Sequence, residues 1–217
     1  MAGSPRSARE TGQTFTYGDY RAWPPEERWE LIDGVPHAMT APSTNHQEVL
    51  LKLGRLFDEQ LEGKPCRPFI APVDILLPKG DEQDDEVVHV LQPDLVIFCD
   101  RDKIRPKNCR GAPNLVVEIL STSTSSFDHL KKKSLYERFG VREYWLVHPD
   151  EGVITIYQRE ASGLFGASRV VSRDDTVEVA ILPGVTIEFP KVYARIPNPY
   201  VAKEPPARAY SAQSATE

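Results

Sequence analysis

Two short apolar segments of the chain each contain one carboxylate. Asp94 directly follows Pro93 and precedes the run LVIF, and Glu118 lies inside the run NLVVEIL. A carboxylate in a Val/Ile/Leu strand is costly unless a cation, a hydrogen-bond network or a metal ion compensates for its burial. Strand alternation places Asp94 on one face with Val96, and Glu118 on one face with Val116. If the two strands pair, the two acids can converge on one point.

Two converging carboxylates predict a site for a divalent cation. Carboxylates within about 4–6 Å of each other raise each other's pKa unless a cation lies between them. Because such ligands are all oxygen atoms, Mg²⁺ or Mn²⁺ suits the site better than zinc. Spacing alone leaves an alternative, in which Asp94 caps a turn and Glu118 pairs with a buried arginine or lysine.

The next candidate is a lysine on the helix predicted over residues 128–139. Each residue turns the helix by about 100°, so the direction of every side chain follows from the sequence. The inward arc contains Leu135, Tyr136 and Phe139. Lys132 falls inside this arc, Lys131 lies at its flank, and Lys133 points away to solvent. Leu130 lies off the arc, which favours packing on two sides. Lys132 is therefore expected to approach the acids, unless its side chain snorkels to the rim.

Three further polar residues are candidates for the same site. Glu30, in WELIDG, is either a third acid of the site or a cross-strand partner of Arg28 or Arg21. His46, near the start of a predicted helix, either contacts substrate or only occupies the first helical turn. Asp74 interrupts the apolar alternation of its strand, which indicates an acid that faces the site or a satisfied hydrogen bond in the core.

A basic segment connects the two acid-bearing strands. Its side chains could form a track for nucleic-acid phosphates, and a solvated charged loop is the alternative. The basic residues are Arg101, Lys103, Arg105, Lys107 and Arg110.

Length and composition favour one compact domain with a single active site. The chain has 217 residues, of which 40% are hydrophobic and 27% are charged. We expect a disordered tail over residues 1–13, a domain over 14–202 and a second disordered tail over 203–217. The net charge of −6 excludes a uniformly basic surface, but a local basic groove is compatible with it.

Cysteine and histidine usage predicts neither a zinc site nor a disulfide framework. Cys66, Cys99 and Cys109 have no CxxC spacing, and the five histidines are scattered. No apolar run approaches the roughly 20 residues that a membrane span needs. We therefore expect a cytoplasmic chain with reduced cysteines and no membrane partner.

The apolar patterns predict an α/β (α+β) fold with a mixed β-sheet flanked by helices, and with extra β-hairpins at both ends. A hairpin turning at Asp33-Gly34 is the first clear element. Ser43 or Thr44 then caps a long helix. The predicted elements, in order, are a short helix at 17–22, a hairpin at 27–39, a helix at 44–61, strands at 69–77, 87–98 and 114–120, the helix at 128–139, a hairpin at 142–158 and further strands near 170, 176–180 and 185–189.

Together these segments resemble the Uma-two family of endonucleases, in the PD-(D/E)XK restriction-endonuclease-like superfamily. The resemblance covers about residues 17–189 and implies a restriction-endonuclease-like core. The matching segments are WELIDG, Ser43 with His46, QPDLVIF, GAPNLVVEILSTST, Asp128 with Lys132 and Tyr136, and GVREYWLVHP.

The resemblance also implies roles for individual residues. Asp94 is the aspartate of the PD half, and Glu118 is the acid of the (D/E)XK half. Leu120 stands where the catalytic lysine of the superfamily is ordinarily found, so the resemblance suggests that Lys132 has taken over this function. Tyr136, one helical turn from Lys132, is an accessory candidate.

The implied activity is Mg²⁺-dependent (or Mn²⁺-dependent) hydrolysis of phosphodiester bonds in DNA. Asp94, Glu118 and the backbone carbonyl of Ile119 would bind the metal ion. The alternative is a nucleic-acid-binding accessory protein with a nuclease-like fold and weak or absent catalysis. The sequence also leaves open an RNA or small phosphodiester substrate, and assembly as a homodimer.

Overall fold

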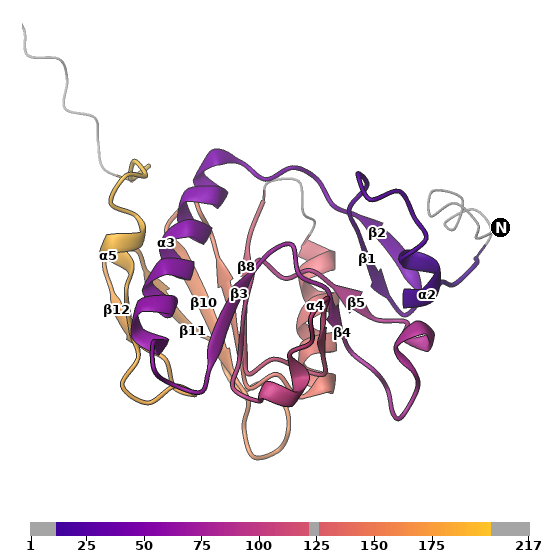
Figure 1. Ribbon diagram of the computed structural model, residues 1–217. Helices are drawn as coiled ribbons and strands as arrows, with labels where there is room; N and C mark the ends of the chain where they lie inside the picture. Colours follow the sequence, from indigo (N-terminus) through magenta and orange to yellow (C-terminus); the bar gives the residue numbers. More distant parts are fainter. Residues whose placement is uncertain (1–11, 122–125, 201–217) are drawn as a thin grey trace, which may run out of the picture.

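The computed structural model describes residues 12–121 and 126–200, and for 126–129 only the backbone (Figure 1). The tails expected at 1–13 and 203–217 lie almost entirely outside the described residues. Residues 122–125, which precede the lysine-bearing helix, lie outside them as well.

A six-stranded mixed sheet forms the centre of the described structure. The spatial order of its strands is β11-β10-β9-β8-β6-β3. Only the β8–β9 pair is parallel among these strands. All five residues of β8 are buried, as the unbroken apolar run predicts. The strands are β3 (Arg67–Ile70), β6 (Leu95–Phe98), β8 (Leu115–Ile119), β9 (Glu143–Val147), β10 (Val153–Gln158) and β11 (Arg169–Ser172).

Helices cover both faces of this sheet (Figure 1). On one face, α3 (Thr44–Leu61) packs with α5 (Phe189–Val192) and the small sheet of β12 (Thr176–Glu178) and β13 (Thr186–Glu188). Ser43 caps α3, as expected. On the other face, Leu135 and Tyr136 of α4 (Ser126–Phe139) join a separate hydrophobic core. The predicted fold class is confirmed.

A second, five-stranded sheet stands beside the first, in the order β2-β1-β5-β4-β7. The hairpin β1–β2 turns at Asp33 and Gly34, whose φ angles of 51° and 76° require left-handed backbone. The sequence predicted this hairpin but not the sheet that it joins. The elements of this region are α2 (Tyr17–Tyr20), β1 (Trp29–Ile32), β2 (Val35–Ala38), β4 (Ile75–Leu76), η2 (Asp84–Glu86), β5 (Val90–Leu91), η3 (Arg101–Lys103) and β7 (Cys109–Arg110).

Two predicted strands are each divided between the sheets, which corrects the sequence interpretation. Residues 69–77 split into β3 and β4 around Pro72, and residues 87–98 split into β5 and β6 around Pro93. Proline has no N–H to donate to a sheet ladder, so a strand tends to end there. The two crossings are adjacent, because Ala71 N donates to Asp94 O at 2.9 Å. Asp94 therefore lies where the chain passes from one sheet to the other.

The expectation of reduced cysteines is wrong for one pair. Cys66 and Cys99 form a disulfide, with Cα atoms 3.8 Å apart. The register of β3 and β6 pairs Arg67 with Phe98, so the two cysteines occupy the next opposed position. A spacing of 33 residues gave no sign of this pairing. Among the described residues, no helix is long and apolar enough to cross a membrane.

Candidate active site

The two acids lie opposite each other on paired strands. Leu95 of β6 pairs with Val117 of β8 in antiparallel register, so Asp94 and Glu118 occupy the next opposed position. Asp94 Oδ2 accepts a hydrogen bond from Ile119 N at 2.8 Å. The predicted pairing of the two strands is confirmed, and it places both carboxylates at the same end of the sheet.

Lys132 links two of the acids. Its Nζ donates to Glu30 Oε1 at 2.9 Å and to Glu118 Oε1 at 3.1 Å. Tyr136, one turn further along α4, donates its hydroxyl to the same Glu118 oxygen at 2.7 Å. Lys132 is only 8% exposed. The helical phase derived from the sequence is therefore correct for this lysine, and Glu30 binds it rather than an arginine.

The prediction for Lys133 is wrong, because this side chain does not point freely into solvent. Its Nζ lies 4.9 Å from the ring centroid of Tyr157 and 5.5 Å from that of Phe165. Glu137 is 3.8 Å away. Tyr157 of β10 and Phe165 of the segment that follows it place these aromatic rings beside Lys133, which the helical wheel could not show. Leu130 is 65% exposed, so it supports no second packing side.

Burial and neighbouring charges shift the pKa values of this cluster. Burial raises the pKa of Glu118 to about 7; Lys132 opposes the shift, while Asp94 and Glu30 add to it. For Lys132, burial favours the neutral amine, but the two glutamates outweigh it and raise the pKa. Burial also raises the pKa of Tyr136, which keeps its hydroxyl protonated as a donor. The lysine thus stays charged between acids that repel each other.

His46 supports Asp94 from the first turn of α3. Its Nε2 lies 3.2 Å from Asp94 Oδ1, and its side chain is 7% exposed. His46 Nδ1 is buried and has no hydrogen-bond partner within the described ranges. Ser43 fixes this turn by accepting a hydrogen bond from His46 N at 3.2 Å. His46 therefore orients an acid, a role that the sequence interpretation had not considered.

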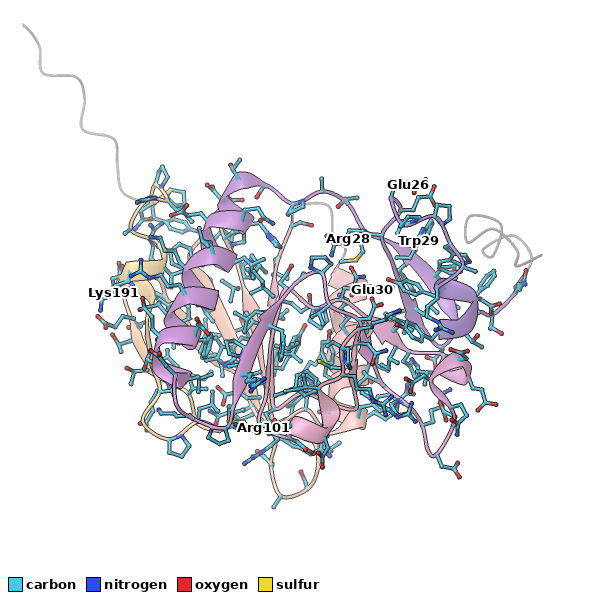
Figure 2. All side chains as sticks on the ribbon, in the orientation of Figure 1. Glu26, Arg28, Trp29, Glu30, Arg101 and Lys191 are labelled. Atoms are coloured by element: carbon cyan, nitrogen blue, oxygen red, sulfur yellow. A yellow bond between two sulfur atoms is a disulfide. The ribbon has the colours of Figure 1, made fainter. Side chains whose placement is uncertain are left out.

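The three acids, Lys132 and His46 line one pocket with a volume of about 200 Å³. The pocket opens between the β1–β2 hairpin and the end of the central sheet, where Figure 2 shows Arg28 and Glu30. Both sheets and both long helices contribute to its walls. The polar lining includes Arg28, Glu30, His46, Gln92, Asp94, Glu118 and Lys132.

Asp74 lies outside this pocket and forms satisfied hydrogen bonds. Its Oδ1 accepts from Tyr20 Oη at 3.0 Å and from Gln92 Nε2 at 2.9 Å. Tyr17 Oη is 3.5 Å from Oδ2. Of the two roles considered for Asp74, the structure supports the hydrogen-bonded one.

The basic segment lies at the opposite end of the strands. The antiparallel pair β6–β8 carries its acids at one end and the connecting segment at the other, and Figure 2 shows Arg101 far from Glu30. Arg105 and Arg110 both pair with Asp84, at 2.7 and 2.6 Å. Lys103 Nζ donates to Ala112 O at 3.0 Å. Arg101 and Lys107 are exposed. The structure therefore does not bring this segment to the acids.

Sequence reasoning missed Arg28 and Gln92 as pocket residues. Arg28, Glu30 and Ile32 alternate along one face of the hairpin and all line the pocket. The period-2 rule that related Asp94 to Val96 could have assigned Arg28 to the face of Glu30. Gln92 gave no comparable signal, because its position depends on the crossing between sheets.

The residues present fit a small divalent cation. Within the described ranges, no three histidine, cysteine, aspartate or glutamate side chains form a ready-made metal cluster. Mg²⁺, however, needs only one or two carboxylates and keeps several waters. The side chain of Glu118 accepts hydrogen bonds from Lys132 and Tyr136, and both are accepted by Oε1. Its Oε2 accepts none from the described residues. Among the described residues, this oxygen is therefore unoccupied and is of the type that Mg²⁺ binds.

Comparison with known families settles the relationship of this chain. The Uma2 family model, described as "Putative restriction endonuclease", matches residues 17–190. The chain belongs to the Uma2 family. This confirms the resemblance drawn from the motifs, and the fold that carries them is nuclease-like.

The chain is also similar to two proteins of Synechocystis sp. and to one solved structure. The uncharacterized protein slr1290 of Synechocystis sp. is 29% identical over 148 residues, which are 67% of this chain and 74% of the relative. The uncharacterized protein sll1609 of the same organism is 23% identical over 124 residues, or 56% and 66% of the two chains. A crystal structure from Anabaena variabilis, described as a putative nuclease belonging to DUF820, superposes with a TM-score of 0.66 at 18% identity. The superposition covers 83% of this chain and 98% of that one, and it supports the same fold.

Proposed function

We propose that this Uma2 protein is a Mg²⁺- or Mn²⁺-dependent endonuclease that hydrolyses phosphodiester bonds in DNA. The observation that carries the proposal is the opposed pair Asp94 and Glu118, with Lys132 bonded to Glu118. An apolar sheet has no structural need for two facing carboxylates, whose repulsion and burial are unfavourable. A divalent cation bound between the two carboxylates would offset their repulsion and could in turn bind an anionic substrate.

The metal ion would be held by Asp94, Glu118 and the backbone carbonyl of Ile119. When bound, it would supply an activated water and neutralise charge on the phosphate. The protein groups keep these ligands in place. Ile119 N and His46 each hold one oxygen of Asp94, and Tyr136 holds Oε1 of Glu118.

Lys132 contributes a preorganised positive charge from α4. Its ammonium is held by Glu30 and Glu118, so it needs little reorganisation to stabilise negative charge that develops on a phosphate oxygen. Glu30 thus holds the ammonium group of Lys132 in place and is also the third acid of the pocket.

A divalent-cation titration tests the proposal. We expect calorimetry to show Mg²⁺ or Mn²⁺ binding by the native chain and its loss in an Asp94→Asn, Glu118→Gln variant, with loss of nicking of supercoiled DNA. The matched control is Asp58→Asn, Glu62→Gln, which removes the same charge from the exposed end of α3.

Equal, weak metal affinity in the native chain and the pocket variant would refute the metal site. DNA binding without cleavage at any cation concentration would favour the accessory protein instead. Parallel assays with RNA and with a small phosphodiester separate the remaining substrate classes.

A further inference from the structure

Arg28 brings a guanidinium group into the same pocket as the acids. Its Nε and Nη2 donate to Gln92 Oε1 at 3.1 and 2.8 Å. Lys132, another cation of the pocket, is engaged by both Glu30 and Glu118. Arg28 takes part in no ion pair with the described residues. Its positive charge is therefore not neutralised by a carboxylate of the pocket.

The way Arg28 is held leaves one edge of its guanidinium group for a ligand. Arginine presents five N–H donors in a planar fork. Gln92 Oε1 accepts hydrogen bonds from the edge formed by Nε and Nη2. The other edge, formed by Nη1 and Nη2, matches two oxygens of a phosphate group, which arginine binds in a bidentate manner.

A chain of hydrogen bonds fixes the orientation of Gln92. Its Nε2 donates to Asp74 Oδ1 and to Tyr20 Oη, both at 2.9 Å. Because a carboxylate only accepts hydrogen bonds and a guanidinium only donates them, the amide has a single suitable orientation between Asp74 and Arg28. Gln92 N also donates to Glu30 Oε1 at 2.9 Å. These bonds fix Arg28 relative to the acids.

The excess of carboxylates in the pocket explains why a phosphate ligand would need the positive charge of Arg28. Glu30, Asp94 and Glu118 face a space in which Lys132 is already shared between two acids. A phosphodiester that approaches three carboxylates is repelled, and a guanidinium at the rim of the pocket offsets this repulsion without a metal ion.

We propose that Arg28 binds a phosphate group of the nucleic-acid substrate next to the acids, and that Gln92, held by Asp74 and Tyr20, positions it. The inference rests on the proposed function, since it names the substrate group that the same pocket holds. It also assigns a role to Asp74, which acts through Gln92 without entering the pocket.

Fluorescence anisotropy with a labelled DNA duplex in EDTA tests this contact apart from catalysis. We expect Arg28→Ala to weaken binding about 10- to 100-fold and to reduce the log–log salt slope by about 0.9. Arg28→Lys keeps the charge and the slope but restores only part of the affinity, because an ammonium cannot form the bidentate contact. The control Arg101→Ala removes the same charge at the far end of the sheet and should change affinity by less than about twofold.

A double-mutant cycle tests the role of Gln92. Gln92→Leu should weaken DNA binding by the native chain and have no further effect in the Arg28→Ala background, if it acts through Arg28. Equal weakening in both backgrounds would overturn the positioning role. Thermal unfolding of each variant separates this readout from loss of fold.

The possible failures are distinguishable. If Arg28→Ala binds DNA as well as Arg101→Ala, or if the native chain does not bind DNA in EDTA, the phosphate contact is wrong. If binding depends on Arg28 but no cation supports nicking, the contact stands and the proposed endonuclease activity fails.

Discussion

The pocket and the segment from Arg101 to Arg110 both contain many charged residues, but those of the pocket are buried and those of the segment are more exposed. In the pocket, the side chains of Lys132 and Glu118 are 10% and 8% exposed. In the basic segment, Arg105 and its partner Asp84 are 41% and 32% exposed. The first pair links α4 to β8, and the second links two surface segments. Clustered charges in a sequence therefore do not mark a site until burial and partners are known.

The contrast has an energetic consequence. Breaking a buried, hydrogen-bonded ion pair by removing one partner costs about 3–5 kcal/mol. An exposed pair contributes about 0–1 kcal/mol, because water and salt screen it. Substitutions in the two regions should therefore differ in size, in stability as well as in activity.

The largest expected effect is on catalysis by Lys132. We predict that Lys132→Met lowers metal-dependent nicking of supercoiled DNA by about 10²–10³, the usual cost of one preorganised charge-stabilising group. Lys131→Met and Lys133→Met should change the rate only a few-fold. An inactive Lys133→Met variant, or full activity in all three, would contradict the assigned role.

This experiment needs a stability control, because Lys132→Met leaves Glu30 and Glu118 without their shared cation. Urea unfolding should show a loss of about 3–5 kcal/mol, against about 0–1 kcal/mol for Arg105→Met in the basic segment. Glu30→Gln, Lys132→Met removes one of the stranded charges and provides a more stable background for the same rate measurement.

The next effect is a change in the pH dependence of stability when the titrating carboxyl group of Glu118 is removed. The pKa of Glu118 is raised from its ordinary 4.5 to about 7, chiefly by burial. Its contribution to stability is therefore complete below about pH 4.5 and is lost as the pH rises through about 7. Glu118→Gln does not titrate and keeps an acceptor for Lys132 and Tyr136. Without metal, the unfolding free energy of this variant minus that of the native chain should therefore rise by on the order of 1–3 kcal/mol from pH 5 to pH 8.

Urea unfolding of both proteins at the two pH values measures this gain. The exposed substitution Glu62→Gln, at the end of α3, is the control and should show no such dependence. A gain that is larger at pH 5 than at pH 8 would contradict the raised pKa.

The smallest effect is expected in the basic segment. Arg101 and Lys107 lie at the end of the sheet remote from the acids, so an Arg101→Ala, Lys107→Ala variant should leave the salt slope of DNA binding unchanged. Two lost phosphate contacts would instead lower the log–log slope by about 1.8. Anisotropy titrations across a salt series decide between these values, and the lower slope would reinstate the segment as a phosphate track.

The sequence by itself determined much of this protein. Periodicity gave the helix α3, the hairpin turn at Asp33 and Gly34 and the buried strand β8, because local sterics and one-sided burial leave a direct pattern. The same rules placed Asp94 and Glu118 on matching faces and Lys132 on the inward side of α4. Side-chain direction within one element is a local property, so it can be derived from spacing.

Only the tertiary structure decided which elements meet. Nothing local indicated that residues 69–77 and 87–98 pass between two sheets, that Cys66 faces Cys99, or that aromatic rings cover Lys133. The contacts of Glu30 with Lys132 and of Gln92 with Arg28 join residues 102 and 64 positions apart. Such contacts depend on the packing of whole elements, because the free energy that selects them comes from burial shared by distant segments.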